Sequence, residues 1–178
     1  MSTDEDHQKG YRWISPIMQF GNKVEVEALA QRGENADKSA VAISALRGAL
    51  NEDERVIYFC ETFSAQCNMS GLNNFFKDSI GLFYYEVVWA LERLGSVEMA
   101  QTLKRCKELI FGDQDVPVGD ESRFYEFISP DRPDWDEIEG ELDQIDEDSG
   151  EERELFEDRL LQFAIASGES GKLTKLGG

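Results

Sequence analysis

The sequence predicts an all-α protein, a single compact multi-helix domain with an acidic C-terminal helical segment. Three observations lead to this fold class. Apolar residues recur with the three-to-four-residue spacing of buried helix faces, helix-capping residues precede several of these stretches, and no segment has a confident strand pattern. Hydrophobic residues are 40% of the 178-residue chain, which is enough to build a core.

Both ends of the chain are expected to lie outside the domain. The first ten residues are polar and acidic, so we predict a flexible tail over 1–10, the helical domain over 11–168, and a second flexible tail over 169–178. From Tyr11 to about Arg32 the sequence gives only a weak indication of structure, because Pro16 and Gly21 interrupt short apolar stretches there.

Stronger helix signals follow in the next part of the chain. The alanine-rich stretch 38–50 predicts a helix, and Asn51 is the expected N-cap of the next one, with Glu54 at the capping-box position. The buried stripe of that second helix is expected to be Val56, Phe59, Cys60 and Phe63. After a bent connection over 68–81, the stretch 80–95 is apolar on nearly every face, which is typical of a central helix.

Two acidic helices are predicted near the C-terminus. Residues 112–133 contain several Gly and Pro residues and indicate a long loop. Asp134 and Ser149 are the expected N-caps of the two helices that follow, with Glu137 and Glu152 at the capping-box positions.

Negative charge is concentrated in this part of the sequence. The formal net charge is -19, and the acidic segment 113–158 holds 20 Asp and Glu against three Arg, a net of -17. The remaining residues are nearly neutral. A charge of this size repels naked nucleic acid and anionic membranes, and it attracts basic proteins and cations.

The stretch 134–148 is predicted to be a docked helix and not a loose acidic tail. Its narrow apolar stripe consists of Trp135, Ile138, Leu142 and Ile145. Nine acids cover the rest of its surface, and no Lys or Arg lies within the helix to pair with them. Most of the acids form two ridges, a first ridge of Asp136, Glu139, Asp143 and Glu147 and a second ridge of Glu137, Glu141 and Asp148.

The spacing of these carboxylates is comparable to that of phosphates in DNA. Fifteen helical residues span roughly 22 Å, so the nine acids provide one charge per ~2.5 Å, against about 1.7 Å for double-stranded DNA. The acids of the next helix extend this surface. The candidate partner-binding residues are Asp134, Asp136, Glu137, Glu139, Glu141, Asp143, Asp146, Glu147, Asp148, Glu151, Glu152 and Glu154.

Other kinds of site have little support in the sequence. The only histidine, His7, falls in the predicted tail, so a histidine-based catalytic centre is not expected, and we predict that the protein is not an enzyme. A calcium loop that started at Asp146 would need glycine at its sixth position, where the sequence has Glu151. No metal site and no cofactor are therefore expected.

The cysteines and the hydropathy indicate a cytoplasmic protein. Cys60, Cys67 and Cys106 are odd in number and form no C-x-x-C pair, which argues against a disulfide framework and a zinc site. No apolar run reaches membrane-spanning length, and the polar N-terminus is unlike a signal peptide.

The stretch 58–96 resembles a small helical bacterial family, domain of unknown function 4375. Its mark is a turn like N-G-G-x-x-Q-F-F-x-N-S-x-G between two helices. The matching residues here are Asn68, Ser70, Gly71, Asn74, Phe75, Phe76, Asp78, Ser79 and Gly81, with Leu94–Gly95 closing the second helix. The departures are Met69 and Ser70 at the first glycine, Asn74 for Gln and Asp78 for Asn.

With its acidic segment, the whole chain resembles the DNA-mimic proteins of the neisserial type within that family. The resemblance implies an all-α homodimer that binds a DNA-binding protein in place of DNA, with a basic helix-turn-helix transcription regulator as the partner type. It implies no catalytic residues and no direct nucleic acid binding. The turn motif over 68–81 is interpreted as a structural element.

The sequence therefore favours a DNA mimic whose acidic surface blocks the DNA-binding site of a basic regulator. The alternative is an acidic adaptor or immunity-like protein for a basic partner unrelated to DNA. A weak cation-binding or purely structural domain is a third hypothesis.

Overall fold

The all-α prediction is confirmed by the computed structural model, which describes residues 2–32 and 37–174. These residues form eight α-helices and two short 3₁₀-helices, and no strand occurs among them. The elements are α1 (Asp4–Gln31), α2 (Lys38–Ala49), α3 (Glu52–Ser70), η1 (Leu72–Asn74), η2 (Ser79–Phe83), α4 (Tyr84–Leu94), α5 (Val97–Phe111), α6 (Glu121–Phe127), α7 (Trp135–Asp148) and α8 (Gly150–Glu169).

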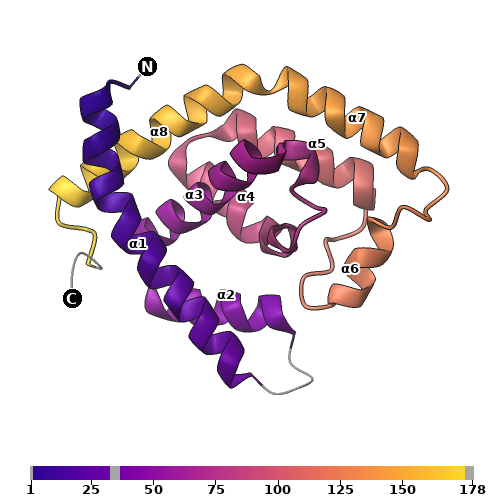
Figure 1. Ribbon diagram of the computed structural model, residues 1–178, viewed down its shortest axis with the longest axis horizontal. Coiled ribbons are helices and arrows are strands. Elements are labelled where there is room, and N and C mark those ends of the chain that lie inside the picture. The colour runs from indigo at the N-terminus through magenta and orange to yellow at the C-terminus, as the bar shows by residue number, and fades with distance from the viewer. Residues whose placement is uncertain (1, 33–36, 175–178) are drawn as a thin grey trace.

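The helices surround a centre formed by α3, α4 and α5 (Figure 1). The long helix α1 packs against α2 on one side of this centre. On another side, α7 and α8 follow one another in a continuous arc, and the far end of α8 returns to contact α1 (Figure 1). The arc places both acidic helices at the edge of the molecule. Among the described residues, no helix has the length and apolar character needed to cross a membrane.

Helix α1 replaces both the tail predicted over 1–10 and the weak pattern after it. Thr3 and Asp6 form a capping box that starts the helix, so the predicted boundary at residue 10 is wrong. Glycine at position 21 is required by packing, since a Cβ there would lie 2.4 Å from the ring of Tyr58. The buried face of α1, with residues at i, i+4, i+7 and i+11, was the missed signal and consists of Gly10, Ile14, Ile17 and Gly21.

Helix α3 contributes nine buried residues to the core. The predicted capping box of Asn51 and Glu54 is present, and the four residues of the predicted stripe are at most 1% exposed. The stretch 80–95 is central, as predicted, but it is not a single helix, because its first part is the 3₁₀-helix η2; Tyr85 on α4 is 43% exposed. Gly95 ends α4 in the left-handed conformation, as expected.

The chain after α8 folds back onto the start of α3. The backbone N–H and the hydroxyl of Thr174 donate to the buried carboxylate of Glu54 at 2.6 and 2.8 Å, and Leu173 is buried. The side chain of Asn51 donates to the carbonyl of Lys172. The predicted tail over 169–178 is therefore wrong as far as residue 174, and residues 175–178 lie outside the described part.

All three cysteines are buried and free, as expected for packed side chains. Burial raises the pKa of the Cys67 and Cys106 thiols to about 12, and it raises that of Cys60 further. The thiols are therefore protonated at neutral pH and are poor nucleophiles.

Candidate partner-binding surface

Helix α7 is docked through its predicted apolar stripe. Trp135, Ile138, Leu142 and Ile145 are all buried, and α7 packs on α5 and η1. Asp134 and Ser149 are the N-cap residues of α7 and α8, as predicted, but neither makes a side-chain cap bond, so the predicted capping boxes are absent. The Asp134 carboxylate instead accepts two hydrogen bonds from Arg132, which lower its pKa, and the Ser149 hydroxyl donates to the carbonyl of Asp146.

Most of the predicted site residues face solvent along the arc of α7 and α8. Nine of the twelve are exposed, and only Glu139, Asp146 and Glu152 are partly buried. These three carboxylates all have partners within the fold. The arc of α7 and α8 therefore carries nine exposed acids and three acids that are bonded within the fold.

The first ridge of α7 faces the connection between α3 and α4. Lys77 forms an ion pair with Glu139, and the side chain of Asn73 donates to Asp143. The other two members, Asp136 and Glu147, are exposed. Residues of this connection therefore pair with or hydrogen-bond to two of the four acids of the first ridge.

Asp146 is bonded inside the fold on two sides. Its carboxylate accepts a hydrogen bond of 2.9 Å from the backbone N–H of Leu72 and pairs with Arg153 at 3.1 Å. Gly71 has a φ of +85°, and a Cβ at this position would lie 2.6 Å from the Asp146 carboxylate. Glycine is therefore needed both for the turn and for the close approach of α7.

The second ridge has no basic partner within the described part of the chain. Glu137, Glu141 and Asp148 are exposed, and their one side-chain hydrogen bond runs from Gln144 to Asp148 at 3.0 Å. Glu151 and Glu154 continue this pattern on α8, since both are exposed and no described cation pairs with them. Exposed carboxylates without a described basic partner are therefore present on α7 and on the first turns of α8.

Sequence reasoning missed the residues that hold the acidic helices in place. Asn68 and Ser64 on α3 donate to Glu157 of α8 at 2.9 and 2.8 Å, while Asn73 and Lys77 hold α7. Three of these residues lie in the stretch 68–81, which the sequence analysis interpreted as a structural turn. The polar residues of this stretch, which lies between two apolar helices, were the sequence signal that could have identified them as contacts for the acidic helices.

The placement of His7 also differs from the prediction. It lies on α1 and lines a small cavity with Tyr11, Glu61 and Glu157. Burial and the nearby Glu157 carboxylate raise the pKa of Glu61. This cavity of about 50 Å³ lies under α8 and not on its acidic face.

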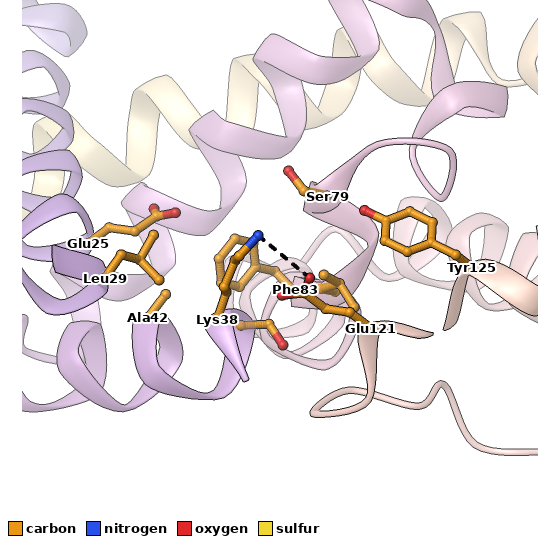
Figure 2. Close-up of a pocket in the computed structure, with 10 residues that line it drawn as sticks. Glu25, Leu29, Lys38, Ala42, Ser79, Phe83, Glu121 and Tyr125 are labelled. Carbon is orange, nitrogen blue, oxygen red and sulfur yellow. Dashed lines mark ion pairs between the residues drawn. The ribbon is translucent and has the colours of Figure 1, made fainter. Parts of the chain in front are cut away.

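A larger cavity of about 240 Å³ lies between α1, α2, η2 and α6 (Figure 2). Leu29, Ala42 and Phe83 form its apolar wall, and an ion pair of 3.9 Å joins Lys38 to Glu121 across it. It is separated from the α7–α8 arc by the central helices (Figure 1). The acidic arc and this cavity are therefore distinct features.

Comparison with known proteins relates the chain to one family. No curated protein and no solved structure matches the chain. The family model described as DMP19-like protein matches residues 48–167, which include α3 to α7 and nearly all of α8. The match contains the turn motif over 68–81 and every predicted site residue. Because it covers more than half of the sequence, the chain belongs to the DMP19-like protein family.

Proposed function

We propose that the protein is a DNA mimic. Exposed carboxylates on α7 and on the first turns of α8 take the place of phosphates in the DNA-binding site of a basic DNA-binding protein and keep DNA out of it. The DMP19-like family is a DNA-mimic family, which supports this assignment. The role requires surface recognition and no catalytic step.

One observation supports the proposal above all. The second ridge and its continuation on α8 form a row of exposed carboxylates without a described basic partner. A surface selected only for solubility mixes charges of both signs. Helix α7 alone spans roughly 21 Å, which is the axial length of about six base pairs of DNA.

The binding energy in this proposal comes from charge complementarity and ion release. A basic protein that binds the acidic row displaces the cations held near it, as it does when it binds DNA. Affinity should therefore fall steeply as salt rises. The partner class that fits is a basic transcription regulator with a helix-turn-helix, the type that the family resemblance implies.

A matched pair of variants tests the proposal. The site variant combines Glu137→Gln, Glu141→Gln and Asp148→Asn. The control variant combines Asp4→Asn, Glu27→Gln and Asp113→Asn, which are exposed residues outside α7 and α8 and change the net charge equally. Each protein and the wild type are used to capture partners from the lysate of the host.

The proposal requires that the wild type and the control retain a DNA-binding protein, that the site variant loses it, and that duplex DNA releases it. If DNA fails to release the partner, the adaptor hypothesis replaces DNA mimicry. If the site variant and the control retain the same proteins, the acidic row is not the binding surface.

A further inference from the structure

One apolar side chain interrupts the acidic row on the outer face of α8. Leu155 is 57% exposed, although its helix begins with acids on nearly every outward position. It lies one turn after Glu151 and one residue after Glu154, and both of these are exposed. A leucine here contributes little to the core and nothing to charge mimicry, and its position matters because it lines a groove with other apolar side chains.

Leu155 lies at the edge of an open groove between α8 and the turn that joins α4 to α5. Leu94 and Phe163 are partly buried against the core and form the apolar lining of the groove. Val97, at the start of α5, is 47% exposed. Leu94, Leu155 and Phe163 form an apolar strip along this groove, and Glu151 lies one turn before Leu155 on the same helix.

The charges around the groove are unequal on its two sides. Arg159, on the side of the α4–α5 turn, donates to the carbonyl of Gly95 at 2.8 Å and pairs with Glu98 at 3.2 Å, so its charge is already matched. On the other side of Leu155, Glu151 and Glu154 have no basic partner within the described residues. A cationic ligand would therefore be attracted to one side and meet apolar surface on the other.

We propose that this groove binds the apolar stripe of a basic amphipathic helix, with Lys and Arg of that helix on Glu151 and Glu154. The inference rests on the proposed function and deepens it, because a helix that reads DNA combines these two chemistries. Such helices contact phosphates through Lys and Arg and thymine methyl groups through apolar side chains. Leu155 would take the place of the thymine methyl groups, and Glu151 and Glu154 would take the place of the charged phosphates. This contact adds a part of the affinity that does not depend on salt and selects among basic partners.

Two synthetic peptides of known composition test the inference with the full-length protein. One is a basic amphipathic helix with a leucine stripe between lysines, and the other has serine in place of each leucine. Affinity is measured by fluorescence anisotropy at low and at high salt. The variants are Leu155→Ala, the pair Glu151→Gln with Glu154→Gln, and Val26→Ala as the control, since Val26 is 66% exposed on α1.

Leu155→Ala should weaken binding of the leucine peptide about fivefold at both salt concentrations and leave the serine peptide unchanged. The Glu pair should weaken both peptides at low salt, and Val26→Ala should change neither. Because Leu155 and Val26 are exposed, thermal unfolding should be the same for all these proteins.

The inference is overturned if Leu155→Ala binds the leucine peptide like the wild type. If the Glu pair still weakens binding in that case, the acidic surface remains supported and only the groove is excluded. If neither change has an effect, the proposed acidic surface fails as well. A second copy of the chain is the other possible occupant, and sedimentation that shows a smaller mass for Leu155→Ala, with unchanged peptide affinity, would assign the groove to it.

Discussion

The two ridges of α7 have nearly the same composition, but the fold treats them differently. The first ridge faces the connection between α3 and α4, where Lys77 pairs with Glu139 and Asn73 bonds to Asp143. The second ridge faces solvent and has no described basic partner. One ridge thus fastens the acidic helix to the core, and the other remains available to a partner.

The comparison shows that a count of acids overstates the size of the binding surface. Carboxylates bonded within the fold have their charge partly cancelled and their position restricted. Free carboxylates keep the charge that attracts a basic protein from a distance. Four experiments test this distinction.

The largest effect is expected for Asp146, the acid of α7 that is bonded to the fold on two sides. Asp146→Ala should lower the free energy of unfolding by about 2–3 kcal/mol, because the N–H of Leu72 and the charge of Arg153 both lose their partner. Urea unfolding followed by circular dichroism measures this loss. Asp148→Ala, on the second ridge, is the matched control and should change stability by less than about 0.5 kcal/mol. Equal losses for the two variants would contradict the distinction.

The second ridge should affect binding without affecting folding. The triple variant Glu137→Gln, Glu141→Gln and Asp148→Asn should weaken binding of a lysine-rich peptide about tenfold at low salt, close to 1.4 kcal/mol. Its stability should stay the same or rise slightly, since like charges on the helix are removed. Titration calorimetry at two salt concentrations measures the change. A loss of stability without a loss of binding would show that the second ridge stabilises the fold and does not bind the ligand.

Removing the cation that pairs with the first ridge should make this ridge bind cationic ligands more like the second ridge does. Lys77→Met removes the ion pair with Glu139, which should cost about 0.5 kcal/mol of stability because the pair is partly exposed. The same change makes the first ridge more negative, so affinity for the lysine-rich peptide should rise about twofold at low salt. Calorimetry and urea unfolding of this variant are compared with Lys23→Met, an exposed pair on α1. Unchanged affinity would show that the first ridge does not contact the ligand.

The smallest effect concerns the carboxylates under α8. Burial and Glu157 raise the pKa of Glu61 in the folded protein, so the folded state holds its proton more tightly than the unfolded chain. Stability therefore falls as pH rises through that raised pKa. Glu61→Gln should be more stable than the wild type at pH 7, by less than about 1 kcal/mol, and the difference should vanish toward pH 4. Urea unfolding midpoints of the variant and the wild type at pH 7 and pH 4 measure this difference. A stability difference that is the same at both pH values would exclude an effect of the Glu61 charge.

The sequence alone determined the fold class, the apolar stripe of α7 and the position of the acidic segment. These features depend on local periodicity and on charge, which are written along the chain. The capping box of Asn51 and Glu54 and the helix end at Gly95 are local as well, because their partners lie within four residues.

Only the tertiary structure decided which carboxylates are free. Glu139, Asp143 and Asp146 find their partners about 60 to 75 residues earlier in the chain, a distance over which periodicity has no information. The same holds for α1, where Gly21 looks like a helix breaker until the ring of Tyr58 is seen against it. Long-range packing bonds some acids within the fold and leaves others exposed, and the sequence shows only that each of these side chains is charged.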